Sequence, residues 1–266
     1  MVSISSKNNS KIKDLIKLRN NSKFRNDKSL FYVEGERILK DTKSSIIREL
    51  YIKKSKLDYF SKFLKKCNKA DIFIVDDDIY DKITDTVNSQ GMIAVVNYDI
   101  LHELDDTFLE KVSLCIILDG INDPGNIGTI FRVAESSNVD LIILINNCCS
   151  IFNPKVIRAS MSSIFRDKIY VADNVDEIYD KLNNNGFMIY ATSLSEKANM
   201  YTDINYTDKI AIVFGNEANG VSQASVNRSH SLIKIPMKGK IESLNVSIST
   251  SIILYEIMRQ NNFYET

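Results

Sequence analysis

Short apolar runs alternate with amphipathic stretches over the first hundred residues. Between residues 8 and 20 the apolar positions recur at helical spacing, which predicts a helix. The alternation that follows is typical of a small three-layer α/β unit, and we expect this unit and the first helix to occupy residues 1–98. Its predicted strands lie at 30–33, 47–52, 72–75 and 91–97, and its predicted helices at 35–41, 59–68 and 77–84.

A second set of apolar runs begins after an acidic, polar stretch at residues 99–111, which we expect to connect two domains. These runs are short and rich in β-branched residues, as in strands that are covered on both faces. Helical patterns separate several of them, so residues 112–266 are predicted to form a mostly parallel, doubly wound sheet. The predicted strands lie at 114–118, 141–145, 169–171, 187–191, 210–214 and 232–235, and the predicted helices at 127–138, 155–164, 175–185 and 246–260.

The amino-acid composition adds little to the predicted fold and domain organisation. Lysine plus arginine equals aspartate plus glutamate at 34 each, so the net charge does not indicate a nucleic-acid partner. Cations are concentrated in residues 7–28, where they fit a solvated helix face and an RNA contact equally well.

Cysteine and histidine usage gives no sign of a metal centre. The four cysteines have no CxxC spacing, and the two histidines add no ligand cluster, so we expect no metal and no disulfide framework. The chain lacks the apolar core of a signal peptide and any run of the ~18 apolar residues that span a bilayer. We therefore expect a soluble protein of the reducing cytoplasm, with no membrane partner.

Candidate chemistry lies where predicted strands end. No G-x-G-x-x-G opens a helix and no P-loop motif is present, so the common dinucleotide and phosphate-binding loops are disfavoured. Ligands of open α/β sheets bind beyond the carboxyl ends of strands. Three glycine-containing polar segments, at residues 119–132, 214–220 and 235–245, begin at or just beyond such ends.

The first segment leads from a strand into a helix. Pro124 and Gly125 predict a turn, after which Asn126 is expected to cap the helix. Free amide groups and the positive end of the helix dipole would then face this loop. Arg132 would project from the same helix a guanidinium suited to phosphate or carboxylate. By itself such a pattern is more often an ordinary cap with a solvated arginine.

The other two segments are also weak signals when taken singly. Gly215 and Gly220 flank Glu217, as expected where backbone approaches a ligand closely, although an ordinary turn has the same composition. In the third segment Ser243 or Asn245 could simply cap the long apolar helix that follows.

Together and in this order, the segments resemble the motifs of the SpoU (TrmH) family of RNA 2′-O-ribose methyltransferases, within the SPOUT superfamily. The resemblance covers nearly all of residues 113–260. The first motif, N-x-G-x-x-x-R, is met by Asn126, Gly128 and Arg132; the second, G-[SN]-E-x-x-G, by Gly215, Asn216, Glu217 and Gly220; the third, I-P-M-x-G-x-x-x-S-L-N-V-S, by residues 235–247.

The N-terminal part is similar to the family's L30e-like substrate-binding domain. The likeness spans residues 24–97 and rests on the stretches 31–37 and 90–96. One departure from the family pattern lies in the C-terminal half. The segment from Arg158 resembles R-A-S-M-G-A, but Ser162 stands where glycine is usual. Ser162 would either change the backbone there or cap a helix end.

The resemblance implies a fold and a cofactor. The C-terminal domain is expected to contain a deep trefoil knot, a rare exception to unthreaded connections, and to bind S-adenosylmethionine in a bent shape. Members are usually homodimers with the active site at the interface. The cofactor-binding residues implied by analogy are Leu194, Gly215, Ile235, Met237 and Leu244.

The resemblance also assigns roles in catalysis and RNA binding. The family assigns removal of the 2′-hydroxyl proton to the arginine of the first motif, here Arg132. Because a guanidinium is essentially never neutral, anchoring a phosphate or stabilising an oxyanion is physically easier for it. Asn126, Glu217, Ser243 and Asn245 are expected to orient Arg132, the ribose or the cofactor, and the residues expected to contact RNA are Arg25, Arg37 and Arg158.

The function that we expect is therefore S-adenosylmethionine-dependent methylation of a ribose 2′-hydroxyl in structured RNA. Large-subunit ribosomal RNA is favoured, because an L30e-like domain suits a folded RNA element that is read by its shape. The alternatives are a tRNA 2′-O-methyltransferase and a non-catalytic RNA-binding ribosome-assembly protein on the same scaffold. The sequence fits a housekeeping role and an antibiotic-resistance role equally.

Overall fold

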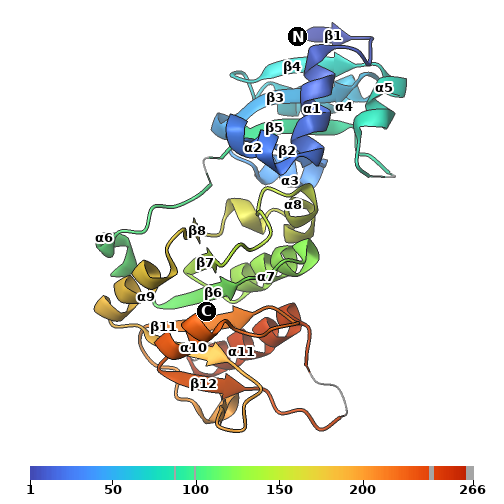
Figure 1. Cartoon of the computed structure of the whole chain (residues 1–266). Coiled ribbons are helices and arrows are strands. Elements are labelled where there is room, and N and C mark those ends of the chain that lie inside the picture. The colour runs from blue at the N-terminus through green and yellow to red at the C-terminus, as the bar shows by residue number, and fades with distance from the viewer. Residues whose placement is uncertain (87, 99, 240–242, 262–266) are drawn as a thin grey trace. The chain divides into compact units, whose positions relative to one another are not determined.

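The computed structural model describes residues 1–86, 88–98, 100–239 and 243–261 (Figure 1). The chain forms two compact units. The first, unit 1, comprises Met1–Ile100 together with Ser150–Phe165, and the second, unit 2, comprises Leu101–Cys149 and Arg166–Thr266.

Unit 1 is built on a five-stranded mixed sheet. The strand order is β1-β4-β3-β5-β2, in which β1, β4 and β3 run parallel while β5 is antiparallel to both of its neighbours. All four strands predicted in this part of the chain are present, and the short β1 adds a fifth. The strands are β1 Val2–Ile4, β2 Leu30–Glu34, β3 Ile47–Lys53, β4 Asp71–Val75 and β5 Met92–Asn97.

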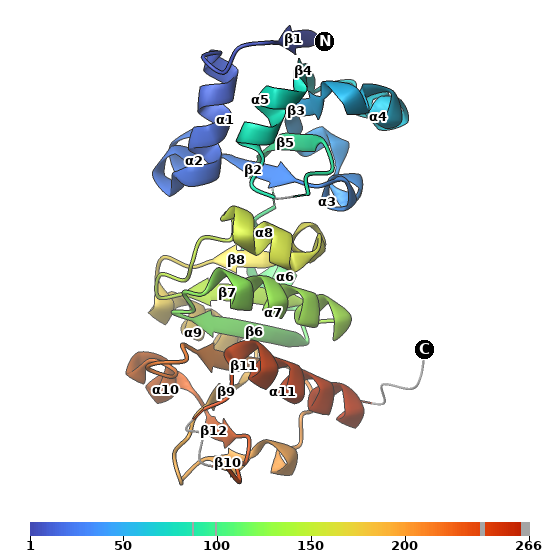
Figure 2. The same ribbon diagram turned by 90° about the vertical axis from the view of Figure 1, so that its right-hand side faces the viewer.

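Helices cover both faces of this sheet. Buried side chains of α1 and α5 pack on one face, against Tyr32, Tyr51 and Val95 among others. Figure 2 shows α3 and α4 on the opposite side. Since successive strand residues point to opposite faces, a chain buried on both sides reads as nearly continuous apolar runs. The helices of unit 1 are α1 Ser10–Asn20, α2 Ser22–Lys28, α3 Glu36–Asp41, α4 Leu57–Leu64, α5 Asp77–Ile83 and α8 Pro154–Ser160.

The segment 150–165 belongs to unit 1, although the sequence placed it in the C-terminal domain. An aromatic cluster explains this. The ring of Phe152 stacks on that of Tyr98, with centroids 3.6 Å apart, and lies 5.0 Å from that of Phe31. Phe165 also stacks on Phe31. Local patterning could not indicate this grouping, because contacts between residues far apart in sequence leave no mark on it.

Unit 2 contains a seven-stranded sheet in which every pair of neighbours is parallel, as the sequence predicted. The strand order is β10-β12-β9-β11-β6-β7-β8. Its strands are β6 Leu114–Asp119, β7 Leu141–Ile145, β8 Ile169–Val171, β9 Met188–Thr192, β10 Asn199–Met200, β11 Ile210–Gly215 and β12 Ser231–Lys234. Its helices are α6 Asp106–Leu109, α7 Pro124–Ser136, α9 Val175–Asn184, α10 Gln223–Arg228 and α11 Val246–Gln260.

The stretch expected as a connector contributes to the core of unit 2. Leu104 and Leu109 are buried in the same apolar cluster as residues of β6 and α9, and Leu109 is the last residue of α6. The backbone amide of His102 donates to the Ile169 carbonyl at the edge of the sheet. Polar composition alone therefore misplaced the start of this unit by about ten residues. The trefoil knot implied by the family resemblance stays a prediction.

Candidate active site

A cavity of about 430 Å³ lies in unit 2 at the carboxyl ends of three neighbouring strands, β9, β11 and β12. The loops that follow these strands form its wall, together with the start of α11. This is the edge at which an open α/β sheet binds ligands. All five residues predicted to bind a cofactor line the cavity: Leu194, Gly215, Ile235, Met237 and Leu244.

Gly215 ends β11 at a point where only glycine fits. A Cβ atom built there would lie 2.1 Å from the backbone carbon of Gly220 and 2.1 Å from the nitrogen of Val221. The loop closes on itself at this place, because the Gly220 amide donates to the Asn216 carbonyl over 2.7 Å. The close approach predicted from the glycines is thus between two parts of the loop that lines the cavity.

Hydrogen bonds join all three motifs. The side-chain amide of Asn126, on α7, donates to the carboxylate of Glu217 in the second motif. The Nδ2 of Asn245, from the third motif, donates to the Oδ1 of Asn126 over 2.9 Å. Each asparagine amide offers both a donor and an acceptor, so Asn126 can link the other two side chains. Of the residues that were expected to act together, Asn126, Glu217 and Asn245 are therefore in contact.

One detail of the first motif differs from the prediction. Asp123 caps α7, and its carboxylate accepts the backbone amide of Asn126 over 2.8 Å. Asn126 lies inside the first turn. An aspartate before proline is the better cap, since proline suits the first helical position. The side chain of Asn126 is thereby available for Glu217 and Asn245.

Asn245 has a second role, which is one of the two alternatives that the sequence left open for the cap of this helix. Its Oδ1 accepts the backbone amide of Ser247 over 3.0 Å and thereby caps α11. The Ser247 hydroxyl donates to the same oxygen over 2.6 Å. Ser243, two residues earlier, is exposed and lines the cavity together with Glu217. The start of α11 therefore fixes one wall of the cavity.

Arg132 lies on α7, where it is exposed to solvent. It is not among the described residues that line the cavity. The helix itself packs against α11, which carries Asn245 at its start. Arg132 is thus carried by a helix that packs beside the cavity, and its exposed side chain remains open to solvent.

Asp119 is a residue beside the site that the motif comparison missed. It ends β6 and is 3% exposed, and its two carboxylate oxygens accept the Asn146 side-chain amide over 2.6 Å and the Ser222 backbone amide over 2.9 Å. Ser222 directly follows the loop that carries Glu217. A buried carboxylate held by two donors is a strong anchor. An aspartate at the end of an apolar strand was the available signal.

Cys148 lies close to the same strand ends. Its thiol accepts the backbone amide of Ile121 over 3.2 Å and lies 3.2 Å from the Leu118 carbonyl. Burial raises the pKa of this thiol to about 11. A protonated thiol is a poor nucleophile, so Cys148 serves to hold the loops after β6 and β7.

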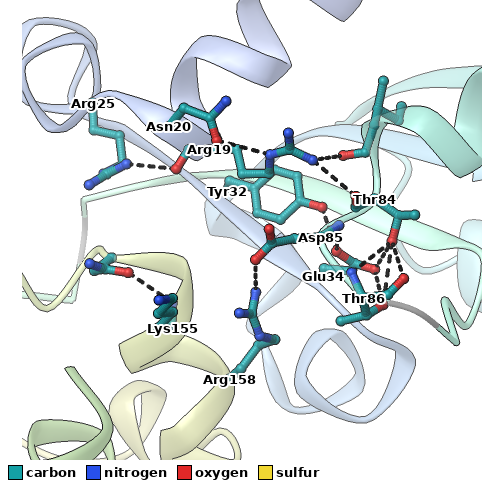
Figure 3. Close-up of polar contacts among 12 residues, drawn as sticks. Arg19, Asn20, Arg25, Tyr32, Glu34, Thr84, Asp85, Thr86, Lys155 and Arg158 are labelled. Carbon is teal, nitrogen blue, oxygen red and sulfur yellow. Dashed lines mark hydrogen bonds and ion pairs between the residues drawn. The ribbon is translucent and has the colours of Figure 1, made fainter.

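The three arginines expected to contact RNA belong to unit 1 and differ in accessibility. Arg25 does not face solvent: it is 4% exposed, and its Nη1 donates to the Leu18 carbonyl and to the Arg19 carbonyl at the end of α1. Figure 3 shows Arg25 beside this end of the helix. The expectation of RNA contact is wrong for Arg25, because its cation satisfies helix carbonyls that have no partner within the helix. Arg37, on α3, is exposed.

Arg158 forms an ion pair with Asp85 within unit 1 (Figure 3). The backbone amide of Asp85 in turn donates to Glu34 over 2.9 Å. Glu34 is buried and also accepts hydroxyl donors from Tyr32 and Thr86. Burial and the neighbouring carboxylate raise the pKa of Tyr32, so its hydroxyl remains a donor. Glu34 thereby fixes the turn that holds the partner of Arg158.

Ser162 occupies a left-handed backbone conformation, with φ of +79°. It follows α8, whose C-cap is Met161, so Ser162 does not cap that helix. Its buried hydroxyl has no hydrogen-bond partner among the described residues. Glycine suits such a φ far better than serine, which explains why glycine is the usual residue here.

Two negative findings apply to the described part of the chain. No group of three or more His, Cys, Asp or Glu side chains there could hold a metal ion. Within the same residues, no helix is long and apolar enough to cross a bilayer.

Comparisons with known proteins agree with this geometry. Residues 113–255 match the SpoU rRNA Methylase family, and residues 9–94 match the MRM3-like substrate binding domain. The chain is 27% identical over 260 residues to the 23S rRNA (guanosine(2553)-2′-O)-methyltransferase RlmP of Bacillus subtilis, covering 97% of this chain and 99% of that protein. It is 39% identical over 159 residues to an uncharacterized tRNA/rRNA methyltransferase of Borreliella burgdorferi, covering 59% of this chain and 69% of the relative.

A solved structure extends the likeness over both units. The AdoMet-bound rRNA methyltransferase from Sinorhizobium meliloti matches with a TM-score of 0.82 and 25% identity, over 97% of each chain. The family match spans the cavity and all three motifs and covers more than half of the chain. The chain belongs to the SpoU rRNA methylase family.

Proposed function

We propose that this protein transfers the methyl group of S-adenosylmethionine to a ribose 2′-hydroxyl of large-subunit ribosomal RNA. The observation that carries the proposal is the hydrogen-bonded link Glu217–Asn126–Asn245, which joins the three motifs beside a cavity at the strand ends. The guanosine in the name of the B. subtilis relative, 2553 of 23S rRNA, is the first candidate target.

The residues around the cavity fit the proposed cofactor. A volume of about 430 Å³ lies within the range of small-molecule sites, which combine apolar walls with a few polar groups. Leu194, Ile235 and Leu244 supply apolar walls, while the 215–221 backbone and Glu217 supply polar groups. When bound, S-adenosylmethionine supplies a methyl group on a positively charged sulfonium.

The chain's own residues have the task of orienting the acceptor. Asn126 holds Glu217 and Asn245 in fixed positions, so little reorganisation is needed when substrate arrives. Arg132 is exposed and always charged, which suits it to anchor a phosphate of the RNA and to stabilise negative charge that develops on the 2′-oxygen. Asp119 keeps the loop that carries Glu217 in place.

The exposed side of α11 supports a proposal for the assembly of the protein. Ile248 and Tyr255 are exposed seven residues apart on α11, where they form one apolar stripe suited to a second copy of the chain. A homodimer is therefore proposed, and sedimentation equilibrium would test it.

Unit 1 is proposed to select the RNA, as supported by its match to a substrate-binding domain. The cytoplasmic location stays a prediction.

The experiment that tests the proposed function uses the full-length protein, radiolabelled S-adenosylmethionine and an unmodified transcript of 23S rRNA. Nuclease digestion and chromatography should reveal a 2′-O-methylated nucleoside in this RNA and none in a tRNA control. Transfer to tRNA alone would favour a tRNA methyltransferase. Binding of RNA without transfer to either would support a non-catalytic ribosome-assembly role.

A further inference from the structure

The segment around α4 is the most strongly basic part of unit 1. Residues 53–69 contain seven lysines and one acidic residue, in a chain whose net charge is zero. Lys53 and Lys54 form ion pairs with Asp81 and Asp76. The remaining five lysines are exposed, and none of them forms an ion pair with a described residue: Lys56, Lys62, Lys65, Lys66 and Lys69.

Helical spacing gathers part of this charge on one face. Tyr59, Lys62 and Lys66 are three and seven residues apart, so they lie along one side of α4 and the turn that extends it. We call these three residues the α4 stripe. Lys66 continues the helical path, since its amide donates to the Phe63 carbonyl over 2.9 Å.

Tyr59 is a large aromatic side chain with 67% of its surface exposed. Its hydroxyl donates to both carboxylate oxygens of Glu36, on α3, at 3.2 Å, and its ring meets that of Phe60 edge-on at 4.9 Å. These contacts hold the ring in place without burying it. Lys40 also forms an ion pair with Glu36, so the carboxylate that holds the ring carries a cation on the α3 side as well.

Part of the positive charge at residues 7–28 is used within unit 1, whereas Lys13 and Lys23 in the same segment are exposed. Arg25 is buried, and Arg19 donates to the carbonyls of Ile83 and Thr84 at 2.9 and 3.0 Å. Lys11 forms an ion pair with Glu49. These cations hold unit 1 together, whereas those of the α4 stripe have no such structural task among the described residues.

We propose that the α4 stripe contacts the RNA substrate, with Lys62 and Lys66 neutralising phosphates and Tyr59 offering a ring on which an unpaired base stacks. This rests on the proposed function, since it takes RNA as the substrate. Lysines interleaved with an exposed, oriented aromatic ring are the combination that binds phosphate and base together. RNA is favoured over an acidic protein surface because residues 9–94 match a substrate-binding domain of an RNA methyltransferase family.

The test measures binding of full-length protein to an unmodified transcript of 23S rRNA across a salt series. The double variant Lys62→Gln/Lys66→Gln should reduce the magnitude of the slope of log affinity against log salt concentration by about 1.5. Each phosphate contact contributes about 0.7 to 0.9 to that slope. The matched control, Lys13→Gln with Lys23→Gln on α1 and α2, removes the same charge from exposed positions and should keep the wild-type slope.

Tyr59→Ala should weaken RNA binding about tenfold at every salt concentration, the size expected for one stacked base. Tyr59→Phe keeps the ring and removes the bond to Glu36, so it should bind within about twofold of wild type. Equal slopes for the two lysine pairs, or wild-type affinity for Tyr59→Ala, would overturn the proposal. Methyl transfer by wild type is measured separately, so a failure of the α4 stripe is distinguishable from a failure of the proposed function.

Discussion

Asn245 donates its side-chain amide to Asn126 over 2.9 Å, although 119 residues separate the two in sequence. The same Asn245 caps α11, and the same Asn126 holds Glu217. Helix position, loop position and the polar edge of the cavity are therefore linked through two amide side chains. This link should be needed for catalysis more than for folding, since all three groups are at least partly exposed.

Asn126→Ala removes both bonds from the centre of this link. We expect kcat/KM for RNA methylation to fall about 100-fold, because small displacements of positioning groups have effects of this size. The melting temperature should change little. Asn122→Ala is the matched control, since Asn122 lies in the loop just before α7 and its side chain donates to the local Gly120 carbonyl, with no bond to Glu217 or Asn245 among the described residues. Similar losses in both variants would contradict the assignment.

Arg132→Ala should lower kcat about 10² to 10³-fold while leaving cofactor affinity within a few-fold of wild type. The reason is its exposed place on α7, outside the described lining of the cavity. Calorimetry and single-turnover transfer give the two quantities. A large loss of cofactor affinity would place Arg132 in the cavity and refute this role.

Ser162→Gly should stabilise the protein by about 1 kcal/mol. It relieves a φ of +79° and removes a buried hydroxyl without a partner among the described residues. Ser163→Gly should have the opposite effect, because the Ser163 hydroxyl donates to the Ser160 carbonyl over 2.8 Å. Thermal unfolding of both variants checks the pair, and destabilisation by Ser162→Gly would be the contrary result.

Phe152→Ala should destabilise unit 1 by about 3 kcal/mol, as expected for a buried aromatic ring. Affinity for S-adenosylmethionine should remain, because the cavity residues all belong to unit 2. Proteolysis in the presence of cofactor would separate the two effects. Early cleavage within unit 2 instead of unit 1 would show that the segment 150–165 stabilises the other unit.

Local pattern was sufficient to predict most strands and the parallel sheet, because buried parallel strands such as β6, β7 and β11 are continuous apolar runs. The local pattern also placed the three motifs at strand ends. It could not predict which side chains contact one another within the site. Asp123 caps α7, and Asn126 therefore bonds to Glu217 instead. Sequence spacing does not specify which of the two side chains accepts the backbone amide at the start of the helix.

Contacts between residues distant in sequence could not be predicted from the local pattern. Arg25 lies in a basic stretch that reads as solvated, yet it packs under the end of α1. The segment 150–165 reads as part of the C-terminal sheet, yet Phe152 stacks on Tyr98. Both depend on contacts between residues distant in sequence, and neither changes hydrophobic periodicity.

Calorimetric titration of S-adenosylmethionine into wild type and into the Gly215→Ala and Gly239→Ala variants tests whether the cavity at the strand ends binds this cofactor. At position 215 a new methyl group would lie 2.1 Å from backbone atoms of the loop that lines the cavity, whereas at position 239 it meets nothing within 4 Å. We expect binding by wild type and Gly239→Ala and at least a tenfold weaker affinity for Gly215→Ala. No heat of binding with wild type, or equal affinity in all three proteins, would contradict this expectation.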